Sequence, residues 1–414
     1  MKKFNFKMTN SSFTSKAKYS QGFSLIELMV ALVIGLIVSL AIYGVLNVNE
    51  AHKRTTTSVN DIDQSGAYAI YQFDKIIRSA GSGLAAIEGN ISGAATGNSY
   101  GCPLRAAISG VPLLPKVGAF PAPFASVPLG LTLAPAIIFS QAAGTRGDVV
   151  MTMTGSGGLG EGSTVISDAT SSTTMKVTSL AGFRVGDLLL LRGLTGDPSA
   201  LGSSCYLEQV ANTINYTSNP IDLPLTSIVY TAPPNTVNRA FSLGQVPMFN
   251  LYGVGANNTL SRYDLLSQAN ATANAAGANP SVFVEGVYKM RAIYGVDTST
   301  NQNVATISWV LPTGTYAAAN LLAGTAASNA TLKTIKAIKI GLIMQSSLVE
   351  KVPAGQPGVP SPGITFSGSS ASVTLFADTP AATRITEAVT PLNVRYRVYE
   401  ETVPIRNALT LKAF

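Results

Sequence analysis

Residues 23–46 read FSLIELMVALVIGLIVSLAIYGVL, and Glu27 is the one charged residue among these 24. A helix of that length extends about 36 Å, which exceeds the ~30 Å hydrocarbon core of a bilayer. A secretory signal peptide is the alternative, but its apolar part has about 7–15 residues and ends in small residues. Because this run is longer and continues into YGVLN at residues 43–47, it predicts a transmembrane helix.

Basic residues cluster ahead of this helix. The chain has 28 Lys and Arg against 21 Asp and Glu, a formal net charge of +7, and five lysines precede every acidic residue. Subtracting those five from +7 leaves +2 for the rest of the chain, so no nucleic-acid-binding groove is expected. The positive-inside rule predicts an N-in, C-out topology with the basic tail in the cytoplasm. The five are Lys2, Lys3, Lys7, Lys16 and Lys18.

The helical pattern continues beyond the apolar run. No proline occurs in the first hundred residues, and apolar or small residues recur at helical spacing with charged residues between them. We therefore expect one helix over residues 23–80, of which 23–46 span the membrane and 47–80 form an amphipathic continuation against a soluble domain. The glycines at 81 and 83 provide its end, since glycine fits the left-handed position after a helix.

Residues 81–414 are rich in Ala, Gly, Ser, Thr, Asn and Pro, with short β-branched runs. Only 12% of the whole chain is charged, against a usual ~25%. The pattern predicts an α+β fold, in which the long helix packs on a mainly antiparallel β-sheet domain with long loops and an inserted subdomain near 92–279. Surface loops or short helices are expected over 253–280 and 317–330. Expected strands are 148–154, 174–178, 187–191, 206–210, 227–230, 290–296, 306–310, 335–344 and 394–400.

The start of the chain resembles a known class of signal. A lysine-containing leader, then GFSLIEL at residues 22–28, then the apolar run is similar to the class III leader of type IV prepilins and type II secretion pseudopilins. The resemblance implies that residues 1–22 are a leader peptide, which prepilin peptidase removes between Gly22 and Phe23, leaving 414 − 22 = 392 residues. It also implies N-methylation of Phe23, and a salt bridge from Glu27 to the Phe23 ammonium of a neighbouring subunit in a filament core.

The C-terminal part contains the motifs VEGV at 284–287, YGVD at 294–297, IKIGL at 338–342 and YRVYEETVPIRN at 396–407. With these motifs it resembles the PilW family of minor pilins. This implies a role in a priming or tip complex for a type IV pilus, which serves twitching motility and cell adhesion. The implied partners are other minor pilins, the major pilin, the inner-membrane assembly platform and a PilY-type tip adhesin. The implied location is the inner membrane before assembly and the pilus, at its tip, afterwards.

The leader and the apolar helix are also compatible with two alternatives to a minor pilin. A J-type pseudopilin of type II secretion has the same leader, but the size and the C-terminal motifs favour the pilus. A membrane-anchored envelope enzyme or binding module would need a cluster of ionisable residues, whereas the acidic residues beyond Gly81 are sparse and scattered. His52, the only histidine, would have to serve any imidazole-dependent site, and it belongs to the long helix. No catalytic residue, metal or cofactor is therefore expected.

Cys102 and Cys205 are the only cysteines, and both lie on the exported side. An oxidising compartment favours a disulfide between them, closing a loop of about 100 residues. Two buried free thiols are the alternative. A reactive nucleophile is not expected, because no basic cluster surrounds either cysteine.

Three short motifs imitate functional sites. GSGGLG at 155–160 matches the dinucleotide pattern G-x-G-x-x-G but precedes a poor helix start, so a flexible turn is expected. GNSYG at 97–101 matches a nucleophile elbow, but no histidine follows it in the chain. DTSTN at 297–301 places oxygen ligands at alternate positions without the Gly and Glu of a calcium loop, which favours a hairpin turn at Asp297 over a calcium site.

Overall fold

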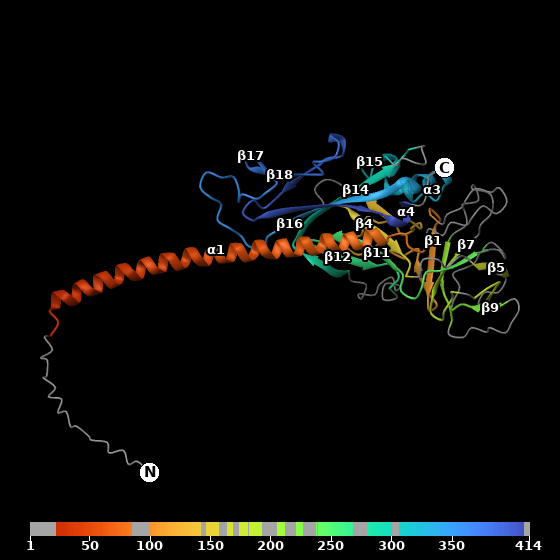
Figure 1. Ribbon diagram of the computed structural model, residues 1–414, viewed down its shortest axis with the longest axis horizontal. Coiled ribbons are helices and arrows are strands. Elements are labelled where there is room, and N and C mark those ends of the chain that lie inside the picture. Colours follow the sequence, from red (N-terminus) through yellow and green to blue (C-terminus); the bar gives the residue numbers. More distant parts are fainter. Residues whose placement is uncertain are drawn as a thin grey trace, which may run out of the picture. The chain divides into compact units, whose positions relative to one another are not determined.

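The chain folds as two compact units, residues 1–56 and 57–414, in a computed structural model (Figure 1). The predicted α+β class is confirmed, with a long N-terminal helix and mainly antiparallel sheets. The basic leader tail and the expected strand 227–230 lie outside the described residues. The structure describes residues 22–84, 100–141, 146–156, 164–168, 174–180, 182–192, 205–211, 221–226, 237, 239–267, 280–299 and 306–409.

Helix α1 (Leu25–Ser79) confirms the helix expected over residues 23–80. The residues that follow α1 stabilise its C-terminal end. Gly81 adopts a φ of +80°, and its N–H donates to the Met153 carbonyl at 2.8 Å. The Asn407 side-chain amide donates to the carbonyls of Ser79 at 3.3 Å and Ala80 at 3.1 Å. A residue near the C-terminus thus satisfies carbonyls that a helix end leaves unpaired.

Four sheets make up the β-structure of the described residues. Almost all strand pairs are antiparallel; β1 and β8 are parallel. The five-stranded sheet has the order β13 (Ser281–Glu285), β12 (Thr259–Asp264), β11 (Met248–Val254), β4 (Val149–Thr154), β3 (Ala136–Phe139). The four-stranded sheet has the order β15 (Ile307–Val310), β14 (Val287–Asp297), β16 (Ile335–Gln345), β20 (Tyr396–Pro404). The three-stranded sheet has the order β17 (Ile364–Ser367), β18 (Ser370–Leu375), β19 (Ile385–Val389). The eight-stranded sheet has the order β2 (Val111–Leu114), β1 (Leu104–Ile108), β8 (Cys205–Gln209), β7 (Leu188–Arg192), β10 (Arg239–Ser242), β5 (Thr164–Asp168), β6 (Thr174–Val177), β9 (Ile221–Pro224).

The later part of α1 is half embedded in this β-structure. Its buried residues follow helical spacing along one face, as an amphipathic helix requires. The Phe73 ring packs edge-on against Tyr252 of β11 and Phe283 of β13, with ring centroids 5.5 and 5.9 Å apart. Figure 1 shows this part of the helix within the region of the β-structure, whereas the earlier part extends away from it. The face consists of Ile62, Gly66, Ala69, Phe73 and Ile77.

Gly66 of α1 lies directly against Tyr399 of β20. A Cβ there would lie 2.3 Å from Cε2 of Tyr399, whose hydroxyl donates to Oδ1 of Asp63 at 2.7 Å. We expect Gly66→Ala to displace this ring and destabilise the domain by about 1–3 kcal/mol, measured by denaturant unfolding in detergent. Gly44→Ala is the control, since no atom lies within 4 Å of a Cβ at that position. Equal stabilities of the two variants would contradict this packing.

The three-stranded sheet covers one face of the four-stranded sheet. Ile343 of β16 and Ile293 of β14 share a core cluster with Val373 and Leu375 of β18. The opposite face of β16, with Ile338 and its alternate neighbours, faces the main core that contains Phe73. Strand β16 is therefore buried along its whole length instead of alternating between core and solvent.

A separate core cluster lies within the eight-stranded sheet. Met175, Val177 and Leu223 have no exposed surface and pack with Leu189 and Leu191 of β7. This cluster falls in the span where an inserted subdomain was predicted, and its independence stays a prediction. Surface loops or short helices were expected over residues 317–330. The structure has two short helices there, α2 (Ala318–Leu321) and α3 (Ala326–Thr334), the second of which extends beyond this span. A last short helix, α4 (Arg406–Leu409), ends the described chain.

Candidate assembly site

The predicted cleavage position lies in an exposed, extended segment. Gly22, Phe23 and Ser24 precede the first turn of α1 and are all exposed, Phe23 with 80% of its surface accessible. No atom lies within 4 Å of a Cβ built on Gly22. The peptide bond between Gly22 and Phe23 is therefore open to an enzyme.

Ser24 caps the helix that follows. Its Oγ accepts from the Glu27 N–H at 3.2 Å, and its carbonyl accepts from the N–H groups of Glu27 and Leu28 at 3.1 and 3.2 Å. A serine at this position stabilises a helix start by about 1 kcal/mol. The cap fixes Glu27 in the first turn, four residues beyond Phe23. Among the residues that the structure describes, no cation lies within ion-pair distance of its carboxylate.

The run from Phe23 to Val48 presents apolar side chains on every side of α1. Each large apolar residue in it has at least half of its surface exposed, from Val38 at 50% to Phe23 at 80%. The helix is long and apolar enough to cross a membrane. In water this surface would be strongly unfavourable, so it needs lipid or other apolar helices around it.

The other residues singled out in the sequence lie in the second unit. Cys102 and Cys205 form a disulfide with a Cα–Cα distance of 5.7 Å, which confirms the predicted bond. The bond lies at the start of the parallel pair β1–β8, where Cys205 is opposite Leu104. It is far along the chain from Phe23 and Glu27, and it plays a structural part.

The three imitation motifs show no assembled site in the described residues. Asp297 accepts from the N–H and Oγ of Ser299 at 3.0 and 2.6 Å, an arrangement typical of a side-chain-stabilised turn. No group of three His, Cys, Asp or Glu side chains suited to a metal occurs in the described part of the chain. Residues 157–160 and 97–99 of the other two motifs lie outside the described residues.

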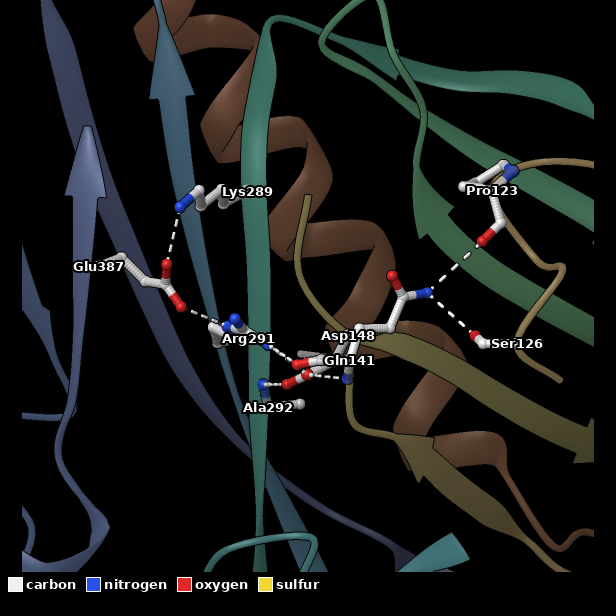
Figure 2. A network of polar contacts seen from close by, with 8 residues as sticks. All are labelled: Pro123, Ser126, Gln141, Asp148, Lys289, Arg291, Ala292 and Glu387. Carbon is white, nitrogen blue, oxygen red and sulfur yellow. Dashed lines mark hydrogen bonds and ion pairs between the residues drawn. The ribbon is translucent and has the colours of Figure 1, made fainter. Parts of the chain in front are cut away.

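The structure assembles a buried ionic network that the sequence did not predict (Figure 2). Arg291 on β14 donates from Nη1 to Oδ1 of Asp148 at 2.7 Å and from Nε to Oε1 of Glu387 at 2.6 Å. Lys289, two residues earlier on the same strand, donates to the other Glu387 oxygen at 2.7 Å. The four side chains are each at most 7% exposed and carry two positive and two negative charges.

The network joins three separate elements. Asp148 precedes β4, Lys289 and Arg291 lie on β14, and Glu387 lies on β19. Burial raises the pKa of Asp148, while Arg291 and the backbone N–H groups of Ala292 and Gln141 favour the ionised form. Because each buried charge is paired with an opposite charge, we interpret the network as a set of ion pairs that holds the sheets together. Its one signal in the sequence is a pair of basic residues two positions apart, Arg291 within the expected strand 290–296 and Lys289 just before it.

Comparison with protein families assigns both ends of the chain. Residues 251–407 match the family described as type IV pilus-assembly protein W, and residues 17–43 match the prokaryotic N-terminal methylation motif. The second match contains Gly22, Phe23 and Glu27, and the first contains β14, β16, β20 and the helix-capping Asn407. No curated protein and no solved structure matches the chain.

These matches confirm the resemblance to PilW-type pilins. The chain is a type IV pilus-related protein with a prepilin-like N-terminus and a membrane-anchoring helix. Such proteins are structural, and the family suggests contact with other pilus components and with the membrane assembly machinery.

Proposed function

We propose that this chain is a minor pilin that prepilin peptidase cleaves between Gly22 and Phe23 and that joins the pilus through its helix. The observation that carries this proposal is the exposed junction of Gly22 and Phe23, directly followed by the capped start of α1 with Glu27 in its first turn. Cleavage there would create a new amino terminus on Phe23, and N-methylation would follow at the same nitrogen.

The new amine supplies the cation that Glu27 needs. A carboxylate within a membrane-spanning segment costs about 2.5–3.5 kcal/mol at the bilayer centre unless it is partnered. Two unit charges 4 Å apart attract by about 4 kcal/mol at an effective dielectric near 20, before desolvation. A salt bridge from Glu27 to the Phe23 ammonium of a neighbouring subunit would therefore set the register between otherwise uniform apolar helices.

The place of the protein within the pilus is the finer part of the proposal. Before assembly it would be a single-pass inner-membrane protein with its N-terminus inside, and afterwards part of a priming or tip complex with other minor pilins. The major pilin, the inner-membrane assembly platform and a PilY-type tip adhesin would be its further partners. The match of residues 251–407 to a pilus-assembly family supports this role over that of a type II secretion pseudopilin.

The decisive test is Glu27→Ala. The variant should be cleaved normally, because Gly22 and Phe23 are unchanged, yet its amount in sheared pili should fall at least about tenfold, the effect of losing ~1.4 kcal/mol. Immunoblots of membrane and sheared fractions measure this. Glu50→Ala is the matched control, since Glu50 lies on the same helix and pairs with Arg54 at an exposed position.

A processing control separates the two steps. Gly22→Ala should leave the full-length precursor in the membrane, and intact-mass analysis should find Phe23 at the start of the mature wild-type chain. Wild-type levels of the Glu27→Ala variant in pili would refute the salt bridge. Normal maturation of Gly22→Ala would refute the cleavage position.

A further inference from the structure

Strand β15 leaves one side of the four-stranded sheet open. It pairs with β14 in regular antiparallel register, from Asp297 opposite Ile307 to Tyr294 opposite Val310, and β14 lies between it and the rest of the sheet. Figure 1 shows β15 at the rim of the domain. Within the part of the chain that the structure describes, no backbone hydrogen bond reaches its other side. Its free N–H and C=O groups are therefore available to another strand.

Several other sheet edges are protected in ways that natural proteins use against unwanted pairing. Strands β2 and β9 contain Pro112 and Pro224, which cannot donate to a neighbour. Strand β13 has a bulged register with β12, and helix α2 packs on β3. Strand β15, with the sequence ISWV, has no proline, no charge and no bulge. A regular, unprotected edge of this kind can accept a further strand.

A groove begins where β15 ends. Pro312, two residues beyond Val310, lines it together with Phe139 at the end of β3, Ala318 of α2 and Leu322. The groove has a volume of about 560 Å³, and none of its ten lining residues is charged. Small side chains on its walls leave room for an apolar side chain of a partner.

We propose that β15 and this groove together accept an extended, uncharged segment of another protein, which adds a strand to the sheet. An extended backbone matches the unpaired N–H and C=O groups of the edge, and an apolar side chain of the segment fills the groove. A charged side chain would lose hydration there without gaining a counter-ion. The surface lies within residues 57–414, so the proposal stands independently of cleavage and of the helix core.

Trp309 gives a direct measurement, because it is the only tryptophan and lies on β15. We would titrate the full-length protein in detergent with a capped seven-residue peptide of alternating threonine and valine. The expected result is a saturable change in Trp309 emission and slower amide hydrogen exchange at Ile307–Val310. The same peptide with N-methyl groups at alternate residues should not bind, since it lacks donors on one edge.

Two variants locate the binding. Ile307→Lys places a charge on the edge and should weaken peptide binding at least about tenfold. Val165→Lys is its matched control, because Val165 and Ile307 are both 40% exposed and β5 lies inside its sheet. Ala319→Phe should also weaken binding by narrowing the groove. Equal binding of the methylated peptide, protection of strands other than β15, or pairing of β15 between two copies of the chain would overturn the proposal.

Discussion

Replacing Arg291 with methionine lowers the free energy of unfolding by about 3–5 kcal/mol, because this one guanidinium compensates two buried carboxylates. The Arg291 side chain is 6% exposed, and those of Asp148 and Glu387 are 1% and 7% exposed. Without Arg291, the Asp148 carboxylate keeps only backbone donors, while Glu387 keeps Lys289. Denaturant unfolding of the full-length protein in detergent, followed by circular dichroism, measures the loss.

Arg54→Met is the matched control for this experiment. Arg54 also pairs with a carboxylate, that of Glu50 at 3.0 Å, but the two side chains are 67% and 55% exposed. Removing an exposed pair of this kind costs at most about 0.5 kcal/mol, since water solvates the remaining charge. A similar cost for both variants would show that burial does not decide the strength of the Arg291 network.

The stability deficit of Arg291→Met should depend on pH. Burial already raises the pKa of Asp148 in the native chain, and removing the nearby cation raises it further. A carboxyl whose pKa is higher in the folded state binds more protons there, so stability increases as pH falls through that pKa. The difference between variant and wild type should therefore be largest near neutral pH and shrink as the pH falls through the raised pKa of Asp148. A deficit that grows on acidification would contradict an uncompensated carboxylate.

The long helix could be predicted from the sequence because its signals are local. An apolar run, the absence of proline and the glycines after Ala80 lie in consecutive residues, and α1 starts and ends within two residues of the predicted bounds. The residues of the candidate assembly site could also be predicted, because they too lie close together in the sequence. Gly22, Phe23 and Glu27 fall within six consecutive residues, so one motif contains both the proposed cleavage position and the carboxylate.

The sheets were harder to predict, because burial in them depends on distant segments. Strand β16 has the alternation expected of a strand with one buried face, yet β18 and β19 cover its other face. Strands β17, β18 and β19 were not predicted at all. They are short and partly exposed, as in β18, where only Ala371, Val373 and Leu375 are buried.

The ionic network could not be predicted for the same reason, because its residues are far apart in the sequence. Arg291 meets Asp148 across a separation of 143 residues and Glu387 across 96. No spacing along the chain connects them, and the acidic residues of this region look scattered until the sheets fold. Composition alone therefore underestimated how many ionisable groups this domain brings together.

Removing the disulfide has the other large expected effect on stability. Cys102 and Cys205 are separated by 103 residues, and a loop of about 100 residues corresponds to as much as ~4.7 kcal/mol of closure entropy. The bond lies beside the parallel pair β1–β8, so it holds together two strands that the unfolded chain would keep far apart. We expect the double variant Cys102→Ala and Cys205→Ala to lose about 3–5 kcal/mol in denaturant unfolding.

Reductant provides the control for this prediction. Wild-type protein with reductant should unfold at nearly the same denaturant concentration as the double variant, and reductant should not affect the double variant. The unfolded wild-type chain should also migrate faster on a non-reducing gel, because the closed loop makes it more compact. Two free thiols titrated in the native protein, or an equal effect of reductant on both proteins, would refute the bond. A loss of stability confined to the wild type would show that reductant acts through the Cys102–Cys205 bond.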